Sequence, residues 1–365
     1  MNSRLTLVAL TGLSLLSQAA GQTWTHCNPM NTTCPSNPAL GSNATFNFVD
    51  ERPNNKVWNQ TAGPMKYGSG GAEFTVAERG QSPTIQSNFY ILFGTVSVIM
   101  QAARGQGIIS SIVLESDDLD EVDWEFIGGN ETHVESNYFG KGNTSSFDRA
   151  IYHPLDFIPQ DSYHNYSTLW TAEKMEWWID NKLVRTLLYG EANGGYNFPQ
   201  TPMNVRLGIW AGGDVKNSKG TIEWAGGLTE YKSAYSMFIK SVDVRDFSTG
   251  SSYTYGDHSG SWQSIKIAQG NSTILKEIIA PSGVSGHWKA LPKTARTAII
   301  ACAIGGFVIL LLAVIAFCIV QGRKGKKERA IADAQWAKEQ QETNQYRMQM
   351  MKGGFSYEHK PVQNS

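Results

Sequence analysis

The stretch DLDEVDWEF, residues 118–126, places a carboxylate at every second position of a strand-like apolar run. Alternate side chains of a β-strand share one face, so Glu121, Asp123 and Glu125 project together and the apolar residues between them pack behind. Three like charges on one face repel, and a strand that merely faced solvent would normally interleave them with cations. The pattern therefore predicts a strand with a buried apolar face and an acidic face that has a chemical use.

The strand belongs to a region of short alternating runs between about residue 44 and residue 247. Gly, Asn, Asp and Pro separate these runs, and all four favour turns. Asp180-Asn181 lies between two runs of β-branched and aromatic residues and predicts a hairpin. Because helical periodicity is nearly absent, the region predicts an all-β sandwich of two sheets, about 200 residues long. We assign it to one domain, residues 22–247.

Paired carboxylates on one face of a sheet are what glycoside cleavage requires. One attacks the anomeric carbon and the other protonates the departing oxygen. Asp123 would hold a shared proton or hydrogen bond between the two glutamates, and its charge would raise the pKa of a neighbouring Glu. Asp118 and Asp120 precede the strand, and we expect them in the turn that leads into it rather than on the acidic face.

The segment DEVDWEFIG, residues 120–128, resembles the E-[ILV]-D-x-E-[FIL] signature of glycoside hydrolase family 16, whose fold is a concanavalin-like β-jelly roll. Other segments are similar to the Crh branch of that family, the fungal cell-wall transglycosylases. They are CNPMNTTCP (27–35), ESNYFGKG (135–142), YHNYSTLWTAEKMEWWIDNKLVRT (163–186), PQTPMNVRLGIWAGG (199–213) and YGDHSGSWQSI (255–265). The resemblance therefore extends over about residues 24–267.

By position, Glu121 matches the nucleophile of the family, Asp123 the assisting carboxylate and Glu125 the general acid/base. The resemblance implies a retaining double displacement on chitin, a β-1,4-linked N-acetylglucosamine chain, with β-glucan or chitin as acceptor. Two alternatives stay open: a mainly hydrolytic chitinase or β-glucanase of the same family, and a carbohydrate-binding jelly roll without catalysis. The intact set of carboxylates argues against the second. No cofactor is implied, and without an acidic loop of calcium-site spacing we expect no metal.

Aromatic side chains are expected to build the cleft. Pyranose rings stack their apolar faces on Trp and Tyr, while sugar hydroxyls and acetamides need polar partners. The candidates are Tyr138, Trp210 and Trp224 for stacking, and Asn137, Lys141 and His164 for polar contacts.

The N-terminal segment predicts secretion, and an apolar segment near the C-terminus predicts a membrane span. Residues 1–21 have an early cation, an apolar core and small residues at their end, which is typical of a signal peptide. Residues 297–320 are an uncharged apolar run, longer than the roughly 20 residues that a helix needs to cross hydrocarbon. The tail, residues 321–365, begins with a cluster of cations, which the positive-inside rule places in the cytosol. We expect a type I single-pass plasma-membrane protein whose catalytic domain faces the cell wall.

The segment between domain and span, residues 248–296, is rich in Ser, Gly, Thr and Tyr, which predicts a stalk or a loosely packed extension. A lipid-anchor signal is the alternative to the span. Such signals stop at their apolar tail, whereas a polar tail follows here.

Cysteines and sequons fit an oxidising, secreted compartment. Cys302 and Cys318 lie in the predicted span, which leaves Cys27 and Cys34 to form a disulfide. The formal net charge of −1 gives no reason to expect a nucleic-acid partner. Sequons predict N-glycosylation at Asn31, Asn43, Asn59, Asn143, Asn165 and Asn271.

Overall fold

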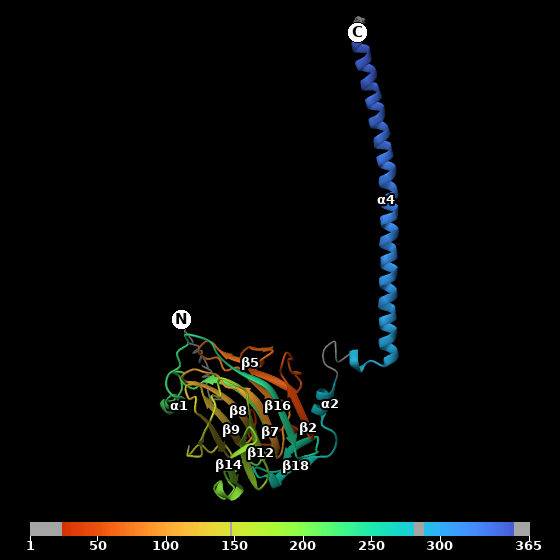
Figure 1. Cartoon of the computed structure of the whole chain (residues 1–365). Helices are drawn as coiled ribbons and strands as arrows, with labels where there is room; N and C mark the ends of the chain where they lie inside the picture. Colours follow the sequence, from red (N-terminus) through yellow and green to blue (C-terminus); the bar gives the residue numbers. More distant parts are fainter. Residues whose placement is uncertain (1–23, 147, 281–287, 354–365) are drawn as a thin grey trace, which may run out of the picture. The chain divides into compact units, whose positions relative to one another are not determined.

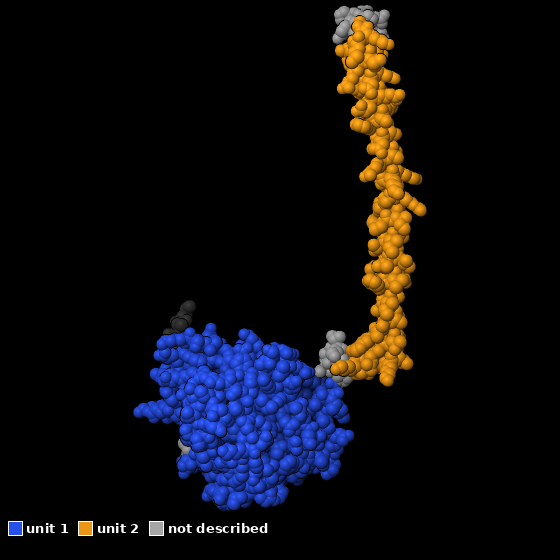
Figure 2. Space-filling model, in the orientation of Figure 1, with its two compact units in different colours: residues 1–280 blue, residues 281–365 orange. Residues whose placement is uncertain are grey.

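The computed structural model describes residues 24–146, 148–280 and 288–353, and the chain divides into two compact units after Ala280 (Figures 1 and 2). The predicted signal peptide, residues 1–21, lies outside the described residues. The first unit consists mainly of two sheets, and the second of a single long helix with a short segment before it.

The seven-stranded sheet carries the acidic strand. Its order is β11-β10-β9-β8-β15-β6-β3, and all its pairings are antiparallel. Its strands are β3 (Trp58–Ala62), β6 (Thr84–Ser87), β8 (Ile108–Ser116), β9 (Glu121–Ile127), β10 (His133–Phe139), β11 (Ile151–Pro154) and β15 (Met203–Ala211).

The second large sheet has the order β14-β13-β12-β7-β16-β5-β4, with β2 also paired to the long strand β16. Its strands are β2 (Asn43–Asn47), β4 (Met65–Gly68), β5 (Gly71–Val76), β7 (Gly94–Gln101), β12 (His164–Trp170), β13 (Lys174–Ile179), β14 (Lys182–Leu188) and β16 (Tyr235–Asp246). At the turn between β13 and β14, Asp180 and Asn181 have φ of 46° and 66°, which confirms the predicted hairpin.

The core lies between these two sheets, and β9 takes part in it through alternate residues. Trp124 and Phe126 are buried against Tyr166 of β12, with ring centroids 5.7 and 4.6 Å apart. The indole Nε1 of Trp177, on β13, donates a hydrogen bond to the backbone oxygen of Asp123 at 3.3 Å. The apolar face of β9 is therefore fixed in the core, so its carboxylates must point to the outer side of the sheet.

The prediction of a stalk or loosely packed extension is wrong for residues 248–280, and residues 281–287 of that segment lie outside the described residues. This segment forms β17 (Ser252–Tyr255), β18 (Ile265–Ala268) and α2 (Thr273–Ile279), and β17 pairs with β1 (Asn37–Pro38). Tyr253 is fully buried, and its hydroxyl donates to Asp246 at 2.6 Å. The sequence did not predict these strands because they are too short to show a period of two. The compact unit therefore extends beyond the predicted boundary at residue 247, to Ala280.

The second unit contains α4 (Lys293–Met351), which Figure 1 draws as one uninterrupted helix. The predicted span, residues 297–320, lies within it, and its apolar side chains are exposed. By length and composition, α4 is the one helix in the described parts of the chain that is able to cross a membrane; its most apolar window has a mean hydropathy of 3.0. The helix continues through the polar residues that follow the span.

Candidate active site

Glu121, Asp123 and Glu125 line a cleft of about 590 Å³ on the outer face of the seven-stranded sheet. The neighbouring strands contribute to the same face: Ser111 from β8, Asn137 and Phe139 from β10, Tyr152 from β11 and Trp210 from β15. One side of the cleft is formed by the short helix α1 (Lys219–Trp224) and the residue that caps it, Ser218. The alternation predicted for β9 thus places three carboxylates together in a hollow of a size that accommodates sugar rings.

Strand register brings two further carboxylates beside these three. On β10, Glu135 pairs with Glu125 and Asn137 pairs with Asp123. On β8, Glu115 pairs with Glu121. Sequence reasoning missed both additional acids. Glu135, Asn137 and Phe139 do alternate along the chain, but only the pairing of β9 with β10 reveals that this alternation faces the cleft.

Burial and mutual repulsion change the protonation of the central acids. Burial raises the pKa of Asp123 well above its usual range, and the charges of Glu121 and Glu125 add to the rise. Asp123 also shares a hydrogen bond with Glu121. Since a protonated Asp123 is the donor in that bond, it holds the Glu121 carboxylate in place. Burial, then the charges of Glu135 and Glu121, likewise raise the pKa of Glu125 well above its usual range.

A buried ion pair lies beside the acidic strand. Glu115 is fully buried and pairs with Arg206 of β15. Arg206 also donates to the backbone oxygen of Trp24 at 2.9 Å and lies over its ring, 4.9 Å from the centroid. Burial raises the pKa of Glu115, and the Arg206 guanidinium opposes that rise. The pair fastens the N-terminal segment to β15 and places a cation near the cluster of acids.

Glu135 has the best hydrogen-bond partners among these acids. The indole Nε1 of Trp224 donates to it at 2.7 Å, and the amide of Asn137 donates at 3.4 Å. Burial raises the pKa of Glu135, and the hydrogen bonds from Trp224, Tyr152 and Asn137 oppose that rise. The Trp224 ring stacks near that of Trp210, with centroids 6.0 Å apart and planes inclined by 25°. Two adjacent indoles beside paired carboxylates form a surface suited to stacking pyranose rings.

Comparison with known proteins identifies the family. The family model described as glycosyl hydrolases family 16 matches residues 52–226. Crh-like protein 2 of Botryotinia fuckeliana is 53% identical over 357 residues, which are 96% of this chain and 79% of that protein. Crh-like protein 3 of Aspergillus fumigatus is 50% identical, over 94% of this chain and 95% of that protein. The chain is a Crh-like member of glycosyl hydrolase family 16.

The chain is also similar to a solved structure described as Crh5 transglycosylase in complex with NAG. It is 53% identical, has a TM-score of 0.64, and covers 66% of this chain and 99% of that chain. The chain is therefore an enzyme of the glycosidase and transglycosylase type that family 16 comprises. The expected jelly-roll sandwich is confirmed.

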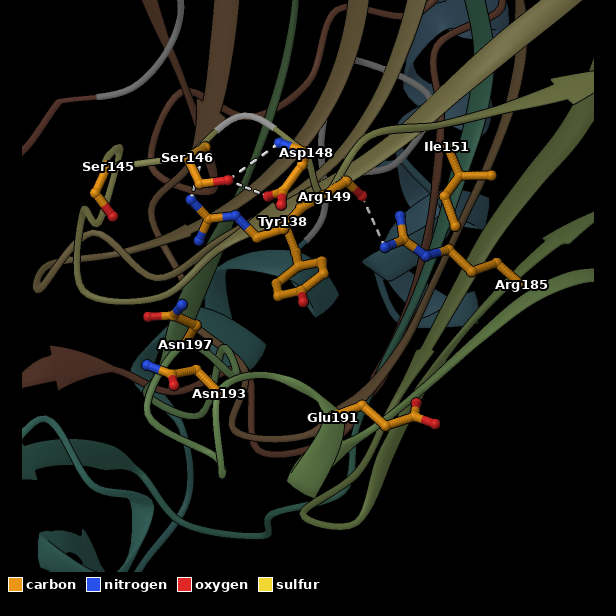
Figure 3. Close-up of a pocket in the computed structure, with 10 residues that line it drawn as sticks. All are labelled: Tyr138, Ser145, Ser146, Asp148, Arg149, Ile151, Arg185, Glu191, Asn193 and Asn197. Carbon is orange, nitrogen blue, oxygen red and sulfur yellow. Dashed lines mark hydrogen bonds between the residues drawn. The ribbon is translucent and has the colours of Figure 1, made fainter.

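The structure separates the six predicted substrate contacts into two groups. Asn137, Trp210 and Trp224 line the family 16 cleft. Tyr138 does not, because neighbouring residues of β10 point to opposite faces. Its ring lies in a second pocket of about 400 Å³, beside Arg149 and Arg185 (Figure 3). The guanidinium carbons of these arginines are 5.9 and 5.3 Å from the ring centroid.

Lys141 and His164 also lie outside the residues that line the cleft. The backbone nitrogen of Lys141 donates to Asp120 at 2.9 Å, and its Nζ donates to the backbone oxygen of Tyr196 at 3.2 Å. His164 begins β12 in the other sheet, where its ring stacks on Phe157 with centroids 3.4 Å apart. These contacts lie away from the residues that line the carboxylate cleft.

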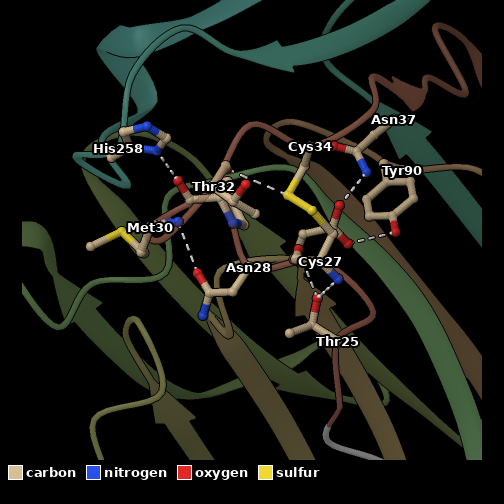
Figure 4. Close-up of a disulfide and its surroundings, with 11 residues drawn as sticks. Thr25, Cys27, Asn28, Met30, Thr32, Cys34, Asn37, Tyr90 and His258 are labelled. Atoms are coloured by element: carbon tan, nitrogen blue, oxygen red, sulfur yellow. Dashed lines mark hydrogen bonds between the residues drawn. A yellow bond between two sulfur atoms is a disulfide. The ribbon is translucent and has the colours of Figure 1, made fainter.

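The predicted disulfide between Cys27 and Cys34 is confirmed, with Cα atoms 5.9 Å apart (Figure 4). Figure 4 also draws Asn37 and Tyr90, which donate hydrogen bonds to Asp117 at 2.7 and 2.9 Å. The disulfide loop and the turn before β9 are thus fastened to the same part of the fold. Cys302 and Cys318 are both unpaired in α4, as expected.

The predicted glycosylation sites differ in exposure. Asn143 and Asn165 are half-buried, and the Asn143 amide nitrogen is bound to Asn197 at 3.0 Å. The remaining four are exposed: Asn31, Asn43, Asn59 and Asn271. All six stay predictions.

Asp118 and Asp120 lie in the turn before β9, as predicted, but they are fully buried. Asp118 accepts hydrogen bonds from the hydroxyls of Ser116 and Thr201. Asp120 accepts from three backbone nitrogens and from the Thr201 hydroxyl at 2.8 Å. These acids fix the start of the acidic strand and do not line the cleft.

Buried acids make the stability of the domain depend on pH. Burial and the neighbouring Asp120 raise the pKa of Asp118 to about 7, and burial raises the pKa of Asp246 to about 6. An unfolded Asp has a pKa of about 3.9, so between about pH 4 and pH 7 the folded state binds more protons than the unfolded state. We therefore expect a lower melting temperature at pH 7.5 than at pH 5, as measured by calorimetry. A melting temperature that rises steadily over this range would contradict the protonation assigned here.

Proposed function

We propose that the chain is a membrane-tethered cell-wall transglycosylase that cleaves chitin and transfers the cleaved chain to β-glucan. The observation that carries the proposal is the set of three carboxylates on β9, in a cleft that also contains Trp210 and Trp224. The structure described as Crh5 transglycosylase in complex with NAG supports a donor built of N-acetylglucosamine, because NAG denotes that sugar.

In the proposed first step, a carboxylate oxygen of Glu121 bonds to the anomeric carbon of the donor while the glycosidic bond at that carbon breaks. The proton of Glu125 passes to the departing oxygen, which leaves as an alcohol. The raised pKa of Glu125 supports this role, because a general acid must hold its proton near neutral pH. The hydrogen bond that Asp123 shares with Glu121 supports its role as the assisting residue.

In the second step, Glu125 is a carboxylate and acts as a base. A hydroxyl of the acceptor gives its proton to Glu125 while its oxygen bonds to the anomeric carbon, and the ester bond to Glu121 breaks. The product retains the configuration of the donor, because the carbon is inverted twice. With a sugar hydroxyl as acceptor the product is a crosslink, and with water it is a shortened donor.

The test is to incubate the full chain in lipid nanodiscs with chitin oligomers and a fluorescent β-glucan oligomer, and to identify products by mass. The expected product joins the label to N-acetylglucosamine units. Shortened chitin oligomers without labelled hybrids would indicate a hydrolase. Binding of chitin oligomers with no new product would indicate a non-catalytic carbohydrate-binding protein. Either result would contradict the proposal.

We further propose that α4 anchors the enzyme in the plasma membrane, with residues 24–280 on the wall side. A chain that ends at Ala280 should leave the membrane fraction and appear in the medium, because it lacks the apolar helix. Its activity on soluble oligomers should stay within about two-fold of the full chain, since the cleft lies wholly in the first unit. Fractionation and an activity assay check both expectations. A truncated protein that stays with the membrane would contradict the anchor.

A further inference from the structure

We infer that Glu135 is a positioning residue that keeps the transferable proton on Glu125, and that Trp224 and Tyr152 hold Glu135 in its charged form. This inference rests on the proposed function, because it gives Glu135 a task only if Glu125 is the general acid.

The first argument is the register of the two strands. Glu135 and Glu125 are direct partners in the antiparallel pair of β10 and β9, and both line the cleft. Partners of this kind have Cβ atoms about 4.5–5.5 Å apart. Glu135 is only 2% exposed, so water screens the pair weakly. Two carboxylates at this distance do not both ionise easily, and near neutral pH one of them holds a proton.

The second argument is that hydrogen bonds select which of the two is charged. Glu135 accepts from the Trp224 indole at 2.7 Å, from the Asn137 amide at 3.4 Å and from the Tyr152 hydroxyl. No hydrogen bond to Glu125 from a side chain is seen in the described part of the chain; its strand partners are Glu135 on β10 and Ser111 on β8. Donors stabilise the charged form that accepts from them, so the charge lies on Glu135 and the proton on Glu125.

Two other charged groups nearby, Glu121 and Arg185, also favour a proton on Glu125 and a charge on Glu135. From β9, Glu121 also repels a charge on Glu125. From β14, the Arg185 guanidinium favours the charged form of Glu135. On β8, the partner of Glu125 is the neutral Ser111. In α1, Lys219 and Glu223 pair with each other and are largely exposed, so their influence is screened.

The arrangement answers a problem that any retaining mechanism meets. The acid must hold a proton in the free enzyme and yet release it to the departing oxygen. A fixed negative charge directly opposite Glu125 raises its pKa, and the effect is second only to that of burial. Burial raises the pKa of Glu135 as well, but hydrogen bonds from Trp224, Tyr152 and Asn137 oppose that rise, and nothing comparable opposes it at Glu125. Of the two acids, Glu135 is therefore the one that carries the charge.

The test is Glu135→Gln in the full chain, with kcat/KM measured against pH on a chitin oligomer. The substitution keeps the shape of the side chain and removes its charge, so the pKa of Glu125 should fall. The alkaline limb of the profile should then move to lower pH by about one unit, while the acidic limb stays in place. Tyr152→Phe should move the same limb in the same direction by less. Glu135→Asp keeps the charge and should leave the limb near its original position.

Glu73→Gln is the matched control, because Glu73 lies on β5 in the other sheet and accepts hydrogen bonds there from Ser236 at 3.0 Å and from Thr75 at 3.2 Å. The Glu73→Gln substitution should shift neither the acidic nor the alkaline limb of the kcat/KM profile. Profiles of Glu135→Gln and the wild type that superimpose, with Glu125→Gln inactive, would overturn this inference and leave the proposed function standing. Loss of activity at every pH together with a lower melting temperature would show a purely structural role and overturn it too. An active Glu125→Gln enzyme would instead contradict the proposed function itself.

Discussion

Glu121→Gln and Glu125→Gln should each lower the rate of transglycosylation by about 10³-fold while leaving the fold intact. Glutamine cannot form the ester that the first step needs, and at position 125 it can neither give nor take a proton. Both side chains lie at the surface of the cleft and keep their volume in the amide, so the melting temperature should change little or rise as repulsion is relieved. Product formation from chitin and labelled glucan oligomers measures the loss.

Azide separates the two roles. With a nitrophenyl donor, Glu121→Ala plus azide should give the α-glycosyl azide, because azide replaces the nucleophile and inverts the carbon once. Glu125→Ala plus azide should give the β-glycosyl azide, because Glu121 still attacks first and azide inverts the carbon a second time. The same anomer from both variants would show that the roles are wrongly assigned. Glu73→Gln again provides the control and should retain wild-type activity.

Asp120→Ala should lower the free energy of unfolding by about 4 kcal/mol or more. The carboxylate accepts from the backbone nitrogens of Lys141, Gln200 and Thr201 at 2.9, 2.8 and 3.0 Å, and it is fully buried. Removing it leaves three N–H groups without an acceptor, and those of Gln200 and Thr201 are buried. Each buried group left without a partner costs about 1–3 kcal/mol. Urea unfolding of the first unit, followed by tryptophan fluorescence, measures the loss.

Asp257→Ala serves as the control for that experiment. Asp257 accepts from the backbone nitrogen of Ser259 at 2.9 Å in an exposed turn, where water can replace it. Its unfolding midpoint should lie close to that of the wild type. An unfolding midpoint of Asp120→Ala equal to that of Asp257→Ala would show that the three backbone contacts do not stabilise the start of β9.

Much of the fold and the centre of the site follow from local pattern. The alternation in residues 121–126 determines that three acids share one face and three apolar residues the other, because successive side chains of an extended chain point in opposite directions. The same rule places Asn137 with the carboxylates and should have excluded Tyr138 from them. The hairpin at Asp180 and Asn181 was readable because both residue types tolerate a positive φ.

The sequence did not predict the positions of residues whose partners are distant in the chain. Glu135 looks like any strand residue until β10 pairs with β9 in one particular register. Lys141 and His164 lie outside the cleft because their positions depend on contacts with Asp120 and Phe157. Residues 248–280 have little pattern of their own, because their burial depends on contacts with other segments. β17 pairs with β1, which lies far earlier in the chain, and Tyr253 bonds to Asp246 at the end of β16.

The sequence by itself therefore determined which acids share a face, the sandwich class, the disulfide and the apolar helix. Only the tertiary structure decided that Glu135 faces Glu125, that Arg206 pairs with Glu115, and that Asp118 and Asp120 are buried. The reason is physical: the face on which a side chain lies is fixed by the local geometry of the backbone, whereas its neighbours, its burial and therefore its protonation are fixed by strand pairing between segments distant in sequence.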